Sequence, residues 1–171
     1  ITDKLSIGNA KKHETLESLL KVSDIISLHV DGRVENTNMI GKREIELMKK
    51  NSILINYSRG NIVDIKALKE NLMNNKLMGA AIDVFPKEPL NNKEKFKSSL
   101  RGIKNLILSP HIGGSTKEAQ KNIGSYVPDK IIDFVNTGDT SNCVNFPELS
   151  LPEQKDSHRL IHIHRNEPGV L

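Results

Sequence analysis

The sequence lacks most of the features that mark extracellular, nucleic-acid-binding or membrane proteins. Its 171 residues include a single cysteine, Cys143, which permits no internal disulfide and fits a reducing compartment such as the cytoplasm. There is no tryptophan and aromatic residues make up only 4%, which leaves little surface for nucleobases to stack on. No apolar run reaches the length of a membrane-spanning helix, and no signal peptide is visible. These absences disfavour a nucleic acid or a membrane as the partner.

The residues that are present suit a globular chain with a solvated surface. Hydrophobic residues make up 36% and charged residues 27%, which is enough to bury the core of one domain and part of another. The formal net charge of +4 comes from lysines that are scattered rather than gathered into one run. The chain starts at Ile1 rather than at methionine and stops at Leu171, soon after a strand-like pattern. We therefore expect a fragment of a longer protein.

Short apolar runs alternate along the chain with segments of helical spacing. The runs at 24–30, 52–56, 79–84 and 105–108 predict buried strands, and small residues in the third predict close packing against a helix. One helical segment begins after Thr15, before the first run, and two more begin between later runs, at Lys42 and after Asp64. No two-residue hairpin signal occurs, so the pattern predicts βαβ units, a mostly parallel sheet and an α/β fold.

The last third of the chain predicts a long helix and then a change of structure. The helix starts at Thr116, and Pro128 inside it predicts a kink that costs up to about 3 kcal/mol. Residues 139–156 read as a linker, and 158–164 alternate as a half-buried strand that opens a second domain. The apolar stripe of the helix consists of Ile123, Val127, Ile131 and Phe134 or Val135.

Three ionisable residues follow successive predicted strands: Arg59, Glu88 and His111. In an open parallel sheet ligands bind beyond the carboxyl ends of the strands, so these side chains are expected at one edge. Arginine grips a carboxylate through two parallel hydrogen bonds, and a glutamate beside a histidine favours the imidazolium and fixes its tautomer. The set suits hydride transfer at a 2-hydroxy or 2-keto acid.

Each of these residues also has a purely structural interpretation. Arg59 could bond a carbonyl near a turn, Glu88 could be a solvated loop carboxylate, and His111 could cap a helix. Asp83, also near a strand end, could be a carboxylate at the edge of the core or could contact a cofactor amide, and both readings stay open. His162 and His164 lie on one face of a predicted strand without a third ligand nearby, so we expect no metal site.

Three blocks of sequence resemble the signatures of the D-2-hydroxyacid dehydrogenase family. They are NYSRG at 56–60, DVFPKEP at 83–89 and PHIGGST at 110–116. The segments NFPELSLP at 145–152, LIHIH at 160–164 and NEPGV at 166–170 resemble the linker and first strand of the family members that carry a C-terminal ACT domain.

The resemblance implies a Rossmann-like NAD-binding domain and assigns its site residues. Arg59 matches the substrate-binding arginine, Glu88 the carboxylate that pairs with histidine, and His111 the proton donor. Asp83 falls where an aspartate meets the nicotinamide carboxamide. The other positions implied to line the nicotinamide side of NAD are Tyr57, Ser58, Ile112, Gly113 and Gly114, together with Arg59 and His111. Tyr57 departs from the small residue that is usual at its position.

The resemblance also implies domain boundaries and regulation. Residues 1–138 would be the C-terminal part of the NAD-binding domain, 139–156 the linker, and 157–171 the start of a truncated α+β ACT domain. His164 and Asn166 match residues that bind the feedback inhibitor L-serine at a subunit interface. The intact protein is then expected to be a homo-oligomer, a tetramer.

The implied reaction is the NAD-dependent oxidation of 3-phosphoglycerate to 3-phosphohydroxypyruvate, and this fragment alone is expected to be inactive. The Gly-rich turn that cradles the NAD phosphates and the acidic residue that binds its ribose are not found in the sequence. Alternatives are a hydroxypyruvate or 2-oxoglutarate reductase of the same family, a non-catalytic NAD-sensing corepressor of the same fold, and an amino-acid-sensing module built around the terminal strand.

Overall fold

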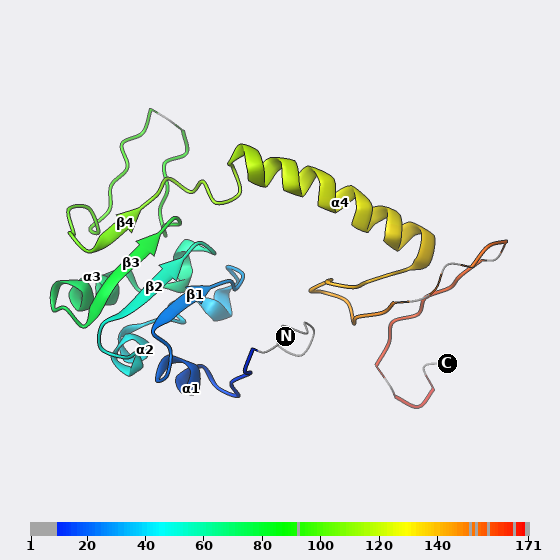
Figure 1. Cartoon of the computed structure of the whole chain (residues 1–171), viewed down its shortest axis with the longest axis horizontal. Helices are drawn as coiled ribbons and strands as arrows, with labels where there is room; N and C mark the ends of the chain where they lie inside the picture. The colour runs from blue at the N-terminus through cyan, green and yellow to red at the C-terminus, as the bar shows by residue number, and fades with distance from the viewer. Residues whose placement is uncertain are drawn as a thin grey trace. The chain divides into compact units, whose positions relative to one another are not determined.

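The computed structural model describes residues 10–91, 93–150, 152, 154–156, 158–165 and 167–169. The chain divides into two compact units, one formed by residues 13–116 and the other by residues 1–12 with 117–171. Figure 1 traces the helices and strands of both units.

A parallel sheet of four strands forms the centre of the 13–116 unit. The strands are β1 (Ile25–Leu28), β2 (Ser52–Asn56), β3 (Leu77–Ile82) and β4 (Leu106–Leu108), and they lie in the order β1-β2-β3-β4. Every neighbouring pair is parallel, which confirms the predicted α/β fold. Because all four strands run the same way, their carboxyl ends meet at one edge of the sheet.

Three short helices begin where the sequence places their first turns. They are α1 (Leu16–Leu20), α2 (Lys42–Leu47) and α3 (Ile65–Met73). The Thr15 hydroxyl accepts the Ser18 N–H and caps α1. The Asp64 carboxylate accepts the N–H groups of Lys66 and Ala67 and caps α3, which satisfies two donors that have no partner within the helix.

The core lies between one face of the sheet and these helices, which gather on the same side of the strands in Figure 1. Ile26, Leu54 and Ile82 point into it and are at most 4% exposed. The prediction of buried strands is confirmed for this face only, because the side chains of Ile25 and Ile107 on the opposite face are 61% and 67% exposed. Within residues 13–116 the helices cover only one face.

The small residues of β3 serve a contact that the sequence pattern does not specify. The predicted packing of this strand against a helix is confirmed, because Ala80 shares the core with Ala67 and Leu68 of α3. In addition, a Cβ atom on Gly79 would lie 3.0 Å from the carbonyl oxygen of Asn105, just before β4. Glycine therefore lets the backbone of β3 approach the start of its neighbouring strand.

The second unit contains the long helix α4 (Lys117–Thr137). The helix continues through Pro128 without interruption, and none of its described side chains is buried. The predicted stripe is therefore exposed: Ile123, Val127 and Ile131 are each 45 to 57% accessible. After the helix, the Thr140 hydroxyl donates to the Pro147 carbonyl and accepts the Leu149 N–H, so part of the predicted linker folds on itself.

The strand predicted over 158–164 is not formed: residues 158–165 have no regular secondary structure. A strand needs a neighbour to pair its backbone N–H and C=O groups, and no strand of the described chain lies in this unit. The alternation of apolar and polar residues suits a strand, but it does not supply the neighbouring strand that pairing requires. Among the described residues, no helix has both the length and the apolar character needed to cross a membrane.

Candidate active site

The register of the sheet brings three polar side chains together just beyond its last paired row. That row consists of Asn56 in β2, Ile82 in β3 and Leu108 in β4. The next residues along the three strands are Tyr57, Asp83 and Ser109, which therefore lie side by side at the carboxyl edge. The sheet order places Asp83 between the other two.

The turn after β2 is built by the buried side chain of Asn56. Its carboxamide oxygen accepts the N–H and the hydroxyl of Ser58 at 3.1 and 2.9 Å, and its nitrogen donates to the Arg59 carbonyl at 3.0 Å. Asparagine at a strand end commonly closes a turn in this way. Arg59 is exposed after this turn, and its guanidinium donates to the Ser58 carbonyl at 2.7 Å.

Gly60 brings the loop after β2 against the loop after β3. A Cβ atom on Gly60 would lie 2.1 and 2.2 Å from the carbonyl carbon and oxygen of Phe85, closer than any side chain tolerates. The absence of a side chain at this position therefore sets the distance between the loop of Arg59 and the loop that carries Glu88.

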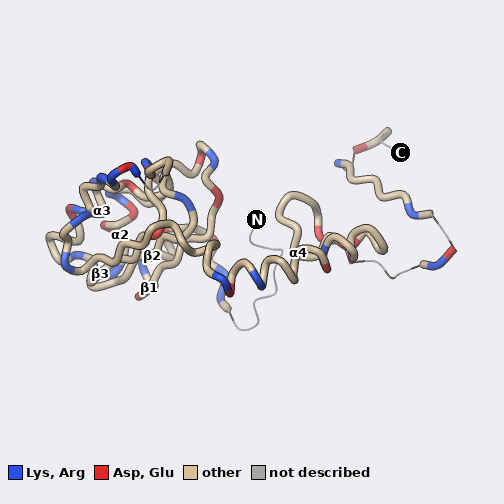
Figure 2. Tube along the Cα trace, turned by 90° about the horizontal axis from the view of Figure 1, so that it is seen from above, with Lys and Arg blue, Asp and Glu red and all other residues tan. Residues whose placement is uncertain are grey.

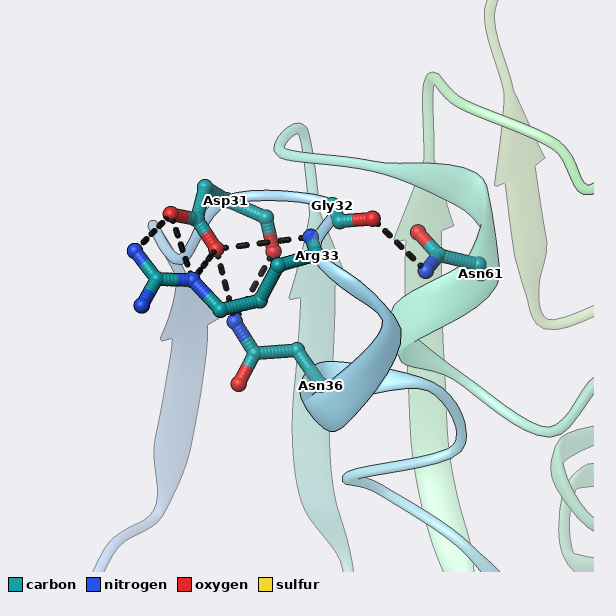
Figure 3. A network of polar contacts seen from close by, with 5 residues as sticks. All are labelled: Asp31, Gly32, Arg33, Asn36 and Asn61. Atoms are coloured by element: carbon teal, nitrogen blue, oxygen red, sulfur yellow. Dashed lines mark hydrogen bonds and ion pairs between the residues drawn. The ribbon is translucent and has the colours of Figure 1, made fainter.

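The loop after β1 packs against the aliphatic part of Arg59. Figure 3 shows the polar network of this loop: the Asp31 carboxylate accepts from Arg33 and from Asn36. The carbonyl of Gly32 accepts the Asn61 side-chain amide at 3.1 Å, and a Cβ atom on Gly32 would lie 2.9 Å from the Cγ atom of Arg59. The Arg33 guanidinium keeps the pKa of the Asp31 carboxyl below its usual range.

Glu88 and His111 form the hydrogen-bonded pair that the sequence predicts. Nδ1 of His111 lies 2.8 Å from Oε2 of Glu88, and the Phe85 N–H donates to Oε1 at 2.8 Å. Burial acts to raise the pKa of Glu88, but the hydrogen bonds from His111 and Phe85 outweigh it and hold that pKa below its usual value. The ionised carboxylate can only accept, so Nδ1 carries the proton and Nε2 is left to exchange a proton with a substrate.

A pocket of about 410 Å³ borders this hydrogen-bonded pair. Glu88 and His111 supply two of its polar side chains, and the apolar residues that line it include Phe85, Phe96 and Leu108. Apolar surroundings beside a few convergent polar groups are typical of small-molecule sites.

Asp83 is 1% exposed, and its contacts are with the loop of His111. Oδ1 accepts the Ser109 hydroxyl at 2.6 Å and the Ile112 N–H at 3.0 Å, while Oδ2 accepts the Gly113 N–H at 2.9 Å. Burial acts to raise the pKa of Asp83, and these donors more than offset it, so the pKa lies below its usual value. Of the two readings left open, these contacts favour the carboxylate at the edge of the core.

Only some of the predicted site residues are in direct contact with one another. Glu88 touches His111, and Asp83 holds the loop through Gly113. The guanidinium of Arg59 bonds a carbonyl near a turn, which is the structural alternative named for it, and its hydrogen bond is to neither Glu88 nor His111. Sequence reasoning missed Asn56 and Ser109, although a polar residue at the end of an apolar strand is a signal for both.

The predicted effector residues have no built site in the described chain. His164 is exposed and its ring stacks on that of His162 at a centroid distance of 4.8 Å. Asn166 lies outside the described residues. No group of three or more histidine, cysteine or acidic side chains in the described part of the chain is arranged to hold a metal ion.

The comparison with known families agrees with the parallel α/β sheet. The family model for the NAD-binding domain of D-isomer specific 2-hydroxyacid dehydrogenases matches residues 3–113, and the chain belongs to this family. The expected Rossmann-like NAD-binding fold and the NAD cofactor are thereby confirmed at the level of the family.

Several individual proteins of the family are similar to this chain in sequence or in structure. The chain is 52% identical over all 171 residues to D-3-phosphoglycerate dehydrogenase of Escherichia coli K12 and spans 42% of that protein. Among solved structures, D-2-hydroxyisocaproate dehydrogenase matches 74% of the chain, and the chain covers 41% of it, at 38% identity and a TM-score of 0.60. D-lactate dehydrogenase from Aquifex aeolicus, in a structure complexed with NAD and lactic acid, is 33% identical with a TM-score of 0.57. The match covers 71% of this chain and 40% of the D-lactate dehydrogenase chain.

Proposed function

We propose that the protein containing this chain oxidises 3-phospho-D-glycerate with NAD to 3-phosphohydroxypyruvate, which would be the first step of L-serine biosynthesis. The observation that carries the proposal is the hydrogen bond between His111 and Glu88 at the carboxyl edge of a parallel sheet, next to the loop of Arg59. The 52% identity to a protein named D-3-phosphoglycerate dehydrogenase supports this choice of substrate.

In the proposed reaction, Nε2 of His111 takes the proton of the substrate hydroxyl while the carbinol carbon becomes a carbonyl. NAD, when bound, supplies the acceptor for the hydride. The Glu88 carboxylate stabilises the imidazolium that forms and keeps Nδ1 as its donor. The exposed guanidinium of Arg59 exchanges its hydrogen bond with Ser58 for two parallel bonds to the substrate carboxylate.

The residues around the Gly113 loop fit the nicotinamide end of NAD. Tyr57 and Ile112 are each 44% exposed and offer apolar surface beside Gly113. A Cβ atom on Gly113 would contact the Asp83 carboxylate at 3.2 Å, so glycine keeps this surface flat. We propose that Tyr57, Ser58, Ile112, Gly113 and Gly114 line this end of the cofactor.

The remaining predictions of the sequence belong to the same proposal. Residues 1–138 would be part of the NAD-binding domain, 139–156 a linker and 157–171 the opening of an ACT domain. His164 and Asn166 would bind L-serine as an effector where subunits of a homo-oligomer, a tetramer, meet, in the cytoplasm. The match to the relative of 52% identity extends through residue 171, so that relative has a counterpart of the last segment as well.

A substrate panel tests the proposal directly. The intact protein is assayed for NADH formation with 3-phosphoglycerate, D-lactate and 2-hydroxyglutarate, and in reverse with hydroxypyruvate, with and without L-serine. The highest kcat/KM is expected for 3-phosphoglycerate, with inhibition by serine. A higher kcat/KM for another acid would assign a different dehydrogenase of the family. NAD binding without turnover of any acid would instead favour the NAD-sensing corepressor.

A further inference from the structure

Two hydroxyl groups connect the loop after β2 to the loop of His111. Oγ of Ser109 lies 3.2 Å from Oη of Tyr57 and 2.6 Å from Oδ1 of Asp83. The ionised Asp83 carboxylate can only accept, and the serine hydroxyl has one hydrogen to give. Ser109 therefore donates to Asp83 and accepts from Tyr57, so the chain of donors runs from Tyr57 through Ser109 to Asp83.

The chain of hydrogen bonds ends on the backbone beside the proton donor. The same carboxylate accepts the N–H groups of Ile112 and Gly113, the two residues after His111. His111 has a φ of 55°, a left-handed conformation that a residue with a side chain keeps only where its surroundings hold it. Asp83 and its donors supply that hold.

Tyr57 contacts this loop through its ring as well as its hydroxyl. A Cβ atom on Gly113 would lie 3.4 Å from Cδ1 of Tyr57, so the ring lies directly against the glycine. One residue separates Tyr57 from Arg59, whereas Ser109 and Gly113 flank His111. The contact therefore joins the segment that carries the arginine to the segment that carries the histidine.

We propose that Tyr57 and Ser109 are positioning residues that keep His111 in register with Arg59. Both side chains act through the buried Asp83 carboxylate and through the contact of the Tyr57 ring with Gly113. The inference rests on the proposed function, because register matters only if both loops act on one substrate. A displacement of about 1 Å at a catalytic group can lower a rate about a hundredfold.

The first test uses Tyr57→Phe and Ser109→Ala in the intact protein. Each variant is expected to lower kcat about tenfold, to leave KM for the hydroxy acid within about twofold, and to raise the solvent isotope effect on kcat, because proton transfer becomes slower. Ser109→Thr keeps a hydroxyl and is expected to restore most of kcat. Tyr126→Phe, at the exposed tyrosine of α4, is the matched control and should leave kcat unchanged.

The second test does not depend on activity. Amide hydrogen exchange at Ile112 and Gly113 is measured in the 171-residue chain, and Ser109→Ala is expected to speed it about tenfold while the amide of Leu54 stays unchanged. If the wild-type protein turns over no hydroxy acid, the proposed function fails and this exchange still decides whether the hydroxyls hold the loop.

Three outcomes would overturn the inference. Amide exchange at Ile112 and Gly113 that is unchanged in Ser109→Ala would show that the hydroxyls do not hold the loop. Faster exchange with an unchanged kcat would show that the two hydroxyls stabilise the loop without affecting catalysis. A lower kcat with unchanged exchange would mean that the hydroxyls act on a bound molecule directly.

Discussion

The chemistry of the site depends on which charged groups are fixed by the chain and which remain available. Both oxygens of Glu88 and both oxygens of Asp83 accept hydrogen bonds from their own chain. The guanidinium of Arg59, by contrast, makes one bond to its neighbouring carbonyl and is exposed. The carboxylates therefore shape the site, and the arginine is the group that has donors left for a substrate carboxylate.

Replacing Arg59 by lysine tests this division. Lysine keeps the charge but loses the planar fork, so we expect kcat/KM for the hydroxy acid to fall about 10- to 100-fold in the intact protein. Steady-state kinetics measures the change. Arg33→Lys, at an exposed arginine of the neighbouring loop, is the control and should change kcat/KM little. An Arg59→Lys variant as active as the wild type would remove Arg59 from the site.

The lowered pKa of Asp83 gives a pH dependence of stability. The pKa of Asp83 in the folded state lies below its unfolded value of about 3.9. The carboxylate therefore contributes its whole stabilisation to the free energy of unfolding at pH values well above about 4, and this stabilisation is lost as the pH falls through the folded pKa. We expect Asp83→Asn to unfold about 1–3 kcal/mol more easily at pH 7, because buried donors lose an acceptor, and to lose less stability on acidification.

Urea unfolding of the 171-residue chain at a series of pH values measures both effects. Asp31→Asn is the control: its carboxylate is also paired, but it is exposed, and solvent screens such pairs. Equal slopes against pH for the wild type and Asp83→Asn would show that the Asp83 carboxylate gains nothing from its donors.

The elements of the sheet unit follow closely from local sequence signals. β2 matches its predicted bounds, α1 begins after Thr15, and α3 begins after Asp64. These features depend on residues close in sequence: a cap, an apolar run and a polar turn. The predicted strand at 79–84 is instead found as Leu77–Ile82, because β3 pairs with its neighbours from Leu77 onward and the apolar pattern alone does not define where pairing stops.

Contacts between elements were harder to predict, since they depend on where separate loops meet. Nothing local to Gly60 shows that Phe85 packs on it, and nothing local to Ser109 shows that it bridges Tyr57 and Asp83. The pairing of Glu88 with His111 was predicted because both follow strands that the parallel sheet aligns. Residue type and strand order sufficed for that pair, whereas the hydroxyl contacts also need the register.

Gly60→Ala tests the contact between the loops after β2 and β3. The added methyl group would overlap backbone atoms of Phe85, which cannot move without displacing the loop of Glu88, so we expect a loss of about 1–3 kcal/mol in the free energy of unfolding. Gly114→Ala is the matched control, because its Cβ atom would meet nothing within 4 Å. If the two variants were equally stable in urea unfolding, the loops would not be held by this contact.

At the scale of the whole molecule, the sheet unit and the family match nearly coincide. The model of the NAD-binding domain matches residues 3–113, and the sheet unit spans 13–116. In Figure 2 the basic and acidic residues, coloured along the Cα trace, are interspersed, in keeping with scattered lysines rather than one basic run. The composition predicted this surface, because it depends only on where charges fall along the sequence.

In the remainder of the chain, sequence patterns predict the helix but not the exposure of its apolar stripe or the absence of the following strand. The spacing predicts a helix from Thr116, which is found as Lys117–Thr137, but its apolar stripe is exposed and 158–165 form no strand. Both expectations assumed a partner surface, and periodicity identifies the face that needs covering without identifying what covers it. The chain spans 42% of the relatives it matches over its full length.

The most direct test of the account is a double-mutant cycle on kcat/KM of the intact protein, with Glu88→Gln, His111→Gln and the double variant. Removing His111 is expected to lower kcat/KM for 3-phosphoglycerate about 10²- to 10⁴-fold, and Glu88→Gln somewhat less. Since Glu88 acts through His111, the double variant should be no slower than His111→Gln alone, within about twofold. Losses that multiply in the double variant would contradict a catalytic pair.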